Sequence, residues 1–332
     1  MKNIEEFLKE ATQNETLKKE VELLESKYAK EGMSDEVKSD FIGLASKYEY
    51  PITIDELNDF YSVDKTDGQV DQVTANDTSY PDWMAKLPNS RSLKDLCIPG
   101  THDTATWKMS PSAKCQWRNI QEQLNDGIRF LDVRVGYNSE LYHGDFACGV
   151  NLRDIISACV NHLNHHRTEA ILVMLSSEGV DYGNAKFREW IEPAFRGYEN
   201  YWYFSNSIPT VGQVRGKMVL VNGSNTGKAG LDLNSFHRQN DWDPGNWKQK
   251  WEKRAQLKVD LILNFIEESR HNNSNCMLMN NWNKQFNFGV PVETYANYIN
   301  SRIGDITNFP RGIQAMDFYY GYNLEHIVKS NF

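Results

Sequence analysis

The sequence has no long apolar runs. None of its 332 residues belongs to an uninterrupted apolar stretch of the roughly eighteen residues that a membrane-spanning helix needs. Its first residues, MKNIEEFLKEATQNE, have neither a basic opening nor an apolar segment, which excludes a secretory signal there. The sequence as written therefore predicts a cytoplasmic protein, with export by a leader-dependent route as the alternative.

Cysteine and basic residues are also scarce. The five cysteines show no CxxC spacing and no Cys/His clusters, which is typical of reduced thiols in a core rather than of a zinc site. Acidic residues outnumber basic ones by 45 to 36, and most of this excess lies in residues 1–65, which hold sixteen acidic and nine basic residues. Such a chain cannot neutralise a polyanion by bulk charge, so we expect no nucleic-acid partner.

Composition divides the chain into three segments. Residues 1–61 predict a small acidic domain of short amphipathic helices, in which Thr53 and Glu56 form a capping box. Residues 62–80 are polar and predict a flexible linker. Residues 81–332 alternate apolar strands with amphipathic helices, which predicts an α/β fold with a parallel sheet, specifically an irregular (β/α) barrel of the TIM type.

Individual elements of the barrel follow from apolar periodicity. A continuous apolar run predicts a strand buried on both faces, and apolar residues at helical spacing predict a covering helix. The predicted strands include 96–98, 129–135, 170–175, 217–221, 276–279 and 313–318, and the predicted helices include 152–166 and 247–270.

The stretch 93–105, LKDLCIPGTHDTA, is the most informative. A short apolar strand meets Pro99 and Gly100, which predict a tight turn after it. The turn delivers His102 and Asp103 side by side at the strand end. Taken alone, such a pair is more often a structural hydrogen bond than a catalytic pair.

A second polar group follows about thirty residues later. The stretch 127–135, GIRFLDVRV, alternates so that Phe130, Asp132 and Arg134 share one face of a strand. His143 then stands before a glycine in the motif YHG. Two histidines, several aspartates and an arginine could together supply a base, an acid and a cation for cleavage of a phosphodiester.

These motifs resemble the bacterial phosphatidylinositol-specific phospholipase C X-domain family. The resemblance rests on IPGTHDT, GIRFLDVRV, YHG and AMDF at 315–318, and it extends over roughly residues 80–332. It implies a barrel whose site lies at the C-terminal strand ends. It also implies cleavage of phosphatidylinositol by attack of its own inositol hydroxyl, which yields a cyclic phosphate and diacylglycerol.

The resemblance also implies roles for individual residues. His102 would be the base that takes the inositol 2-hydroxyl proton, with Asp317 orienting its ring. His143 with Asp103 would be the acid that protonates the diacylglycerol oxygen. Arg134 would bind the phosphate.

The strand that carries Arg134 also bears on metal binding. Asp132 would hold Arg134 or share in its hydrogen-bond network. Eukaryotic relatives place a calcium-binding carboxylate in this part of the strand, whereas a guanidinium supplies positive charge and repels a divalent ion. We therefore predict no metal and no other cofactor, with a residual calcium site at Glu178 as the alternative.

The sequence specifies the head group of the phospholipid substrate less closely than the reaction. Where the bacterial enzymes carry basic residues after two later strands, this chain has Ser177 and Asn222, beside Glu178, and Trp251 corresponds to an aromatic residue that could stack on a sugar-like ring. These four are the predicted substrate-binding residues. The alternatives are a different phosphodiester, such as a glycerophosphodiester or a peptide-linked one, and a non-catalytic binding module.

Two features concern partners. Residues 1–61 resemble the Nif11-like leader domains, which act as recognition handles for other proteins; a helical cap or an oligomerisation module is the alternative. A phospholipid substrate implies transient contact with a membrane surface. The run of His162, His165 and His166 predicts a solvated face near a helix end rather than a metal site.

Overall fold

The computed structural model describes residues 34–61, 79–109, 113–179, 183–245, 249–284 and 290–332, with scattered residues between 6 and 27. No helix in these parts of the chain is long and apolar enough to cross a membrane. The helices are α3 (Asp35–Lys47), α4 (Ile54–Tyr61), α5 (Ile120–Asp126), α6 (Leu152–His165), α7 (Gly183–Phe195), α8 (Val211–Val214), α9 (Trp251–His271), α10 (Val292–Ile303) and α11 (Gly321–Lys329). The strands are β1 (Cys97–Thr101), β2 (Phe130–Val135), β3 (Glu140–His143), β4 (Phe146–Asn151), β5 (Ala170–Ser177), β6 (Trp202–Tyr203), β7 (Lys217–Asn222), β8 (Leu231–Asp232), β9 (His237–Gln239), β10 (Leu278–Asn281) and β11 (Gly312–Met316).

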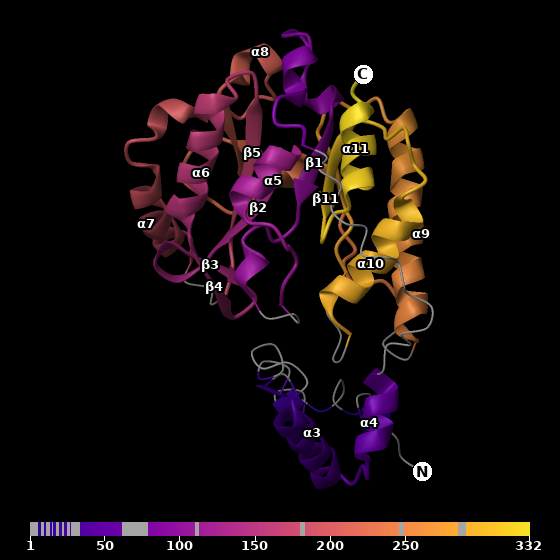
Figure 1. Ribbon diagram of the computed structural model, residues 1–332. Coiled ribbons are helices and arrows are strands. Elements are labelled where there is room, and N and C mark those ends of the chain that lie inside the picture. Colours follow the sequence, from indigo (N-terminus) through magenta and orange to yellow (C-terminus); the bar gives the residue numbers. More distant parts are fainter. Residues whose placement is uncertain are drawn as a thin grey trace.

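The strands form one curled sheet, in the order β6-β7-β5-β2-β1-β11-β10-β9, with β8 added beside β7. All of these neighbours are parallel, whereas β3 pairs antiparallel with the end of β2 and with β4. Figure 1 shows α5 and α6 beside β2, with α7 outside α6, and α11 beside β11, with α9 further out. The predicted irregular α/β barrel is confirmed.

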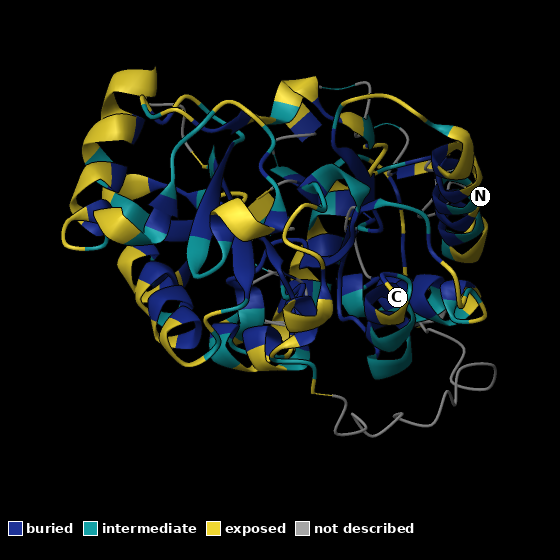
Figure 2. Ribbon diagram, turned by 90° about the horizontal axis from the view of Figure 1, so that it is seen from above, coloured by how far each residue is buried: buried dark blue, intermediate teal, exposed yellow. Residues whose placement is uncertain are grey.

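Burial explains this arrangement. The central strands β5 and β7 are apolar on both faces, because one face meets the covering helices and the other fills the interior of the barrel. Figure 2 shows the strands in dark blue and the outer faces of the surrounding helices in yellow. The predicted strands at 170–175 and 217–221 are β5 and β7, and the predicted helix 152–166 is α6.

The predicted turn at Pro99 and Gly100 is wrong. β1 continues through both residues to Thr101, and the chain turns only after His102. Gly100 is required for space, because a Cβ there would lie 2.8 Å from a ring carbon of Phe130 on the neighbouring strand β2. The Pro-Gly pair therefore reflects the close packing of two strands.

The prediction of a solvated histidine run is wrong for His162. This side chain on α6 is buried, and its ring stacks on His166 at a centroid distance of 4.4 Å. Burial, with a smaller contribution from Arg129, lowers the pKa of His162 to about 2, so the ring is neutral. His165 is exposed, as predicted.

The described part of the N-terminal segment is helical. Ser34 caps α3 by accepting a hydrogen bond from the backbone N–H of Val37 at 3.2 Å. Thr53 and Glu56 form the predicted capping box of α4, with bonds of 2.9 and 3.1 Å. Phe7 packs edge-on against Phe41 in a small separate core. The predicted linker at 62–80 lies mostly outside the described residues.

A buried ion pair joins the N-terminal edges of the sheet and the chain that precedes it. Arg129 and Glu169 are both almost fully buried, and Arg129 Nε donates to a Glu169 oxygen at 2.9 Å. The guanidinium also donates to the carbonyl oxygens of Pro81, Leu124 and Ile128. Because both side chains are buried away from water, their charges and hydrogen-bonding groups are satisfied by these protein atoms alone.

We expect Arg129→Met to lower the free energy of unfolding by about 3–5 kcal/mol, because it leaves the carboxylate of Glu169 buried without its countercharge. Urea unfolding at pH 7 measures the change. The matched control Lys186→Met removes an exposed ion pair with Glu189 and should cost less than about 1 kcal/mol. A loss for Arg129→Met as small as that of the control would contradict this reading of the pair.

Candidate active site

His102 and Asp317 meet because they follow paired residues of two adjacent parallel strands. Thr101 of β1 is in register with Met316 of β11, so the next residue of each chain segment emerges at the same edge of the sheet. Nδ1 of His102 lies 2.8 Å from Oδ1 of Asp317. Asp317 thereby fixes the ring and leaves Nε2 facing the other polar side chains.

The backbone after each of these residues is strained. Asp103 and Phe318 have φ of 42° and 43°, a left-handed conformation that is uncommon for residues other than glycine. Buried amide side chains hold both segments: Gln116 donates to the carbonyl oxygen of His102, and Asn300 donates to those of Asp317 and Phe318. These hydrogen bonds hold the two strained turns that place His102, Asp103 and Asp317 in the site.

Arg134 lies at the centre of the polar cluster. Its Nε is 2.8 Å from Asp103 Oδ1, and its Nη2 is 3.1 Å from Asp132 Oδ2 and 2.8 Å from Nε2 of His102. Its Nη1 is 3.3 Å from Glu178, which follows the neighbouring strand β5. Because its side chain remains 23% exposed, the guanidinium can reach an anionic ligand from this position.

His143 approaches the cluster from the β3–β4 hairpin. Its Nδ1 lies 2.7 Å from the carbonyl oxygen of Ala113, and its Nε2 lies 3.4 Å from Asp103 Oδ2. Both ring nitrogens therefore face acceptors, an arrangement that suits a ring carrying two protons. With a side chain 25% exposed, His143 can donate one of these protons to a bound ligand.

His102 has partners for both of its protonation states. When neutral, its Nε2 can accept from Arg134 at 2.8 Å and from Asn283 at 3.2 Å; when protonated, Nε2 can donate to Asp103 Oδ2 at 3.3 Å. Burial lowers the pKa of His102, but Asp103 and Asp317 outweigh it and raise the pKa to about 9. A ring that has hydrogen-bond partners in both its neutral and its protonated state is suited to proton transfer.

Asp103 stays ionised between the two imidazoles. Burial would raise the pKa of Asp103, but Arg134, His102 and His143 together lower it to about 2. The carboxylate can thus stabilise positive charge on whichever imidazole carries the proton.

A cation fits this donor set poorly. His102, Asp103 and Cys115 bring donor atoms within 4.8 Å of one another. Arg134 lies 2.8 Å from both His102 and Asp103, so a divalent ion held by them would lie against a permanent positive charge. Burial also raises the pKa of the Cys115 thiol well above its usual value, which disfavours the thiolate that a metal requires.

The structure separates the four predicted substrate-binding residues. Glu178 joins the cluster through Arg134 and accepts from the backbone N–H of Gly144 at 2.9 Å. Asn222 uses both ends of its amide within its own loop, on Thr226 and Lys228. Ser177 is exposed, and Trp251 begins α9, where it packs edge-on against Tyr295 and Tyr298.

Sequence reasoning missed Asn283 beside the base and Trp242 in the loop after β9. Asn283 follows β10 in the run NNWNK, so a cluster of polar residues directly after an apolar strand was the available signal. Trp242 is 48% exposed, but β9 spans only three residues, too few for a periodic pattern.

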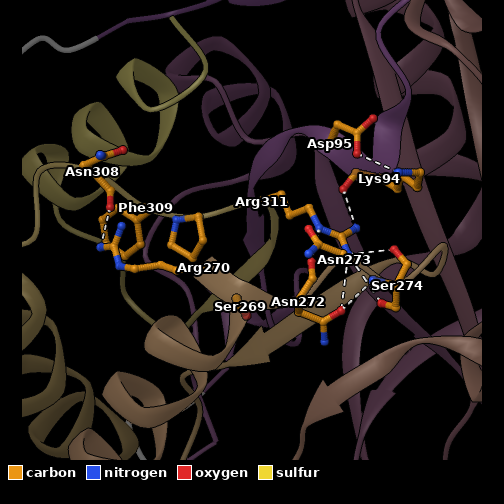
Figure 3. Close-up of a pocket in the computed structure, with 11 residues that line it drawn as sticks. Lys94, Asp95, Ser269, Arg270, Asn272, Asn273, Ser274, Asn308, Phe309 and Arg311 are labelled. Atoms are coloured by element: carbon orange, nitrogen blue, oxygen red, sulfur yellow. Dashed lines mark hydrogen bonds and ion pairs between the residues drawn. The ribbon is translucent and has the colours of Figure 1, made fainter.

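A cavity of about 440 Å³ lies at the opposite, N-terminal edge of the sheet. Figure 3 shows that Arg311, Arg270 and Lys94 line it. Arg311 donates to the carbonyl oxygens of Lys94, Asn272, Ser274 and Cys276. Because these carbonyls use its donors, Arg311 joins chain segments and is not free to bind an anion.

The fold and the site resemble those of phosphatidylinositol-specific phospholipases C. Residues 90–223 match the family model described as "Phosphatidylinositol-specific phospholipase C, X domain". This range contains β1, β2, β3 and β5 and so four of the five strands that carry the polar cluster, while Asp317 lies beyond it.

Individual relatives are similar to this chain beyond residues 90–223. A 1-phosphatidylinositol phosphodiesterase of Listeria monocytogenes is 28% identical over 289 residues, which are 77% of this chain and 86% of the relative. A Staphylococcus aureus protein of the same name is 27% identical over 42% of this chain and 50% of its own length. The solved Listeria phospholipase C structure superposes with a TM-score of 0.67 at 25% identity, over 76% of this chain and 99% of that one.

We expect Asp317→Asn to lower the pKa of His102 by roughly one unit, because it removes one of the two carboxylates that favour the imidazolium. Titration of the labelled imidazole by NMR measures this directly. The exposed carboxylate of Asp305 offers a control, and Asp305→Asn should leave the pKa of His102 in place. An unchanged or higher pKa in Asp317→Asn would refute the assigned electrostatics.

Proposed function

We propose that this chain cleaves the phosphodiester of phosphatidylinositol without a metal, with the hydroxyl beside the phosphate as nucleophile. The observation that carries the proposal is the placement of Asp103 beside both imidazoles, His102 and His143, with Arg134 on its other oxygen. A base, an acid and a cation are what an internal displacement at phosphorus requires. The relatives named 1-phosphatidylinositol phosphodiesterase support the substrate.

The reaction needs two proton transfers. The neutral form of His102 is the base: its Nε2 takes the proton of the inositol hydroxyl, whose oxygen forms a new bond to phosphorus and closes the cyclic phosphate. The bond to the diacylglycerol oxygen breaks, and His143 gives that oxygen a proton. Arg134 turns toward the non-bridging oxygens, and Asp103 stabilises the imidazolium that His102 has become.

The second candidate is cleavage of a phosphodiester with a different head group. It is favoured by Asn222, whose amide is used within its own loop, and by Ser177, which lacks the charge of a basic residue. The chemistry at phosphorus would be the same.

Two histidine variants test the reaction. We expect the intact chain to release water-soluble phosphate ester from phosphatidylinositol vesicles in excess EDTA, and His102→Ala and His143→Ala to lower kcat by at least about a hundredfold. His165→Ala removes an exposed histidine of α6 and should retain full activity.

Loss of activity in EDTA that calcium restores would refute the metal-free mechanism. No turnover of phosphatidylinositol, with turnover of another phosphodiester, would establish the second candidate. No turnover of any phosphodiester would favour a binding module.

We also propose that the catalytic edge contacts a lipid surface. Trp117 and Trp242 are 45% and 48% exposed on loops after β1 and β9, the edge that also carries the site. The ring of Trp117 stacks on Tyr320 and contacts Phe318, so its orientation is set. Aromatic side chains of this kind favour membrane interfaces, and a solved S. aureus relative is described in terms of its membrane binding.

We expect Trp117→Ala combined with Trp242→Ala to weaken binding to phospholipid vesicles by roughly tenfold or more, about 1.4 kcal/mol, as measured by co-sedimentation. Phe332→Ala removes an exposed aromatic ring at the end of the chain, outside this edge, and serves as the control. Equal binding by the double variant and the control would refute the assignment of this edge.

We also propose that residues 1–61 bind a protein partner. This proposal is supported by the acidic excess of this segment and by its own small core around Phe41, which lets it present a surface independently of the sheet.

A further inference from the structure

Asn283 lies against the base from a further strand, β10. Its Nδ2 is 3.2 Å from Nε2 of His102, directly after the end of β10. The preceding residue, Trp282, is 1% exposed; its backbone N–H donates to Ala315 of β11 at 2.8 Å and its indole N–H to Gln314 at 3.1 Å. The sheet therefore fixes the chain immediately before Asn283.

The chain immediately after Asn283 is fixed by charge. The side chain of Lys284 is fully buried, pairs with Asp243 and lies 5.2 Å from the ring centre of Tyr295. Arg254, from α9, pairs with the same oxygen of Asp243. A buried ion pair of this kind is costly to break, so Asn283 is held between two anchored neighbours and needs little reorganisation to act.

The amide N–H of Asn283 has a defined effect on the base. As a donor it requires the lone pair on Nε2 of His102, and it therefore favours the neutral ring that can accept a proton. Arg134 does the same, but in the proposed reaction its guanidinium moves to the phosphate. An amide carries no charge, so Asn283 remains beside Nε2 when Arg134 leaves.

We propose that Asn283 is a further catalytic residue: its N–H favours the unprotonated form of Nε2 of His102, against the pull of the two carboxylates, and then passes to the oxygen of the attacking hydroxyl. Lys284 acts through Asn283 and is a positioning residue. This inference rests on the proposed function, since it assigns Nε2 of His102 as the proton acceptor. The charged and titratable groups around His102 are Asp103, Asp132, Arg134, His143, Glu178, Cys115, Asp317 and, through Asp317, Lys258.

The first test measures the pKa of His102 by NMR in the free protein. Asn283→Ala should raise it by roughly 0.7 unit, the equivalent of one ordinary hydrogen bond, and Asn283→Asp should raise it further because it adds a carboxylate. Lys284→Met should also raise the pKa of His102, whereas Lys284→Arg keeps the positive charge and should leave this pKa at the parental value. Asn308→Ala, at the cavity in Figure 3, is the matched asparagine control and should change nothing.

The second test is kinetic. Asn283→Ala should lower kcat on phosphatidylinositol by roughly tenfold, about 1.4 kcal/mol, while KM changes by less than about threefold. Lys284→Met should likewise lower kcat and leave KM nearly unchanged. The concentration of folded protein is taken from the NMR spectrum, so a general loss of stability would not lower the kcat calculated in this way.

An unchanged pKa of His102 in Asn283→Ala overturns the inference, and so does a full kcat in that variant. If the parental protein leaves phosphatidylinositol intact but Asn283→Ala still moves the pKa, the proposed function fails while the contact between Asn283 and the base is supported. The substitution at Asn283 keeps the test valid even if Lys284→Met does not fold.

Discussion

The guanidinium of Arg134 holds the charges of the site together. Asp103, Asp132 and Glu178 all approach it within 3.3 Å, and three carboxylates so close would repel one another without a cation among them. Because arginine keeps its proton under all ordinary conditions, this compensation does not depend on pH. Arg134 makes the largest favourable contribution to the ionised state of Asp103, ahead of the two imidazoles.

Proton transfer at His102 depends on competing contacts rather than on a single partner. Asp103 and Asp317 favour the charged ring, while Arg134 and Asn283 occupy Nε2 in the neutral ring. The ring can thus gain and lose a proton without leaving a buried polar atom unpaired, which keeps reorganisation small. The strained turns at Asp103 and Phe318 are the structural cost of this arrangement, and Gln116 and Asn300 hold them.

The two edges of the sheet have different roles. At the N-terminal edge, Arg129 is paired with Glu169 and Arg311 is saturated by backbone carbonyls, so these arginines stabilise the fold. At the C-terminal edge, Arg134 and His143 remain partly exposed and can meet a ligand. Separating stability from chemistry in this way is usual for barrels of parallel strands.

The sequence alone determined much of the barrel and the identity of the polar groups. Apolar runs predicted β5 and β7, and alternation placed Asp132 and Arg134 on one face of β2, because burial and the pleat of a strand act on residues close in sequence. His102 and His143 were found for the same reason: each lies in a short local motif at or directly after a strand.

Tertiary structure decided the rest. Gly100 is set by the ring of Phe130 on the next strand, and His162 is buried beside Arg129, neither of which a local pattern reports. Asn283 meets His102 across 181 positions of the chain, because β11 lies between β1 and β10 and aligns their ends. Such contacts depend on strand order and register, which are properties of the assembled sheet and of no single segment.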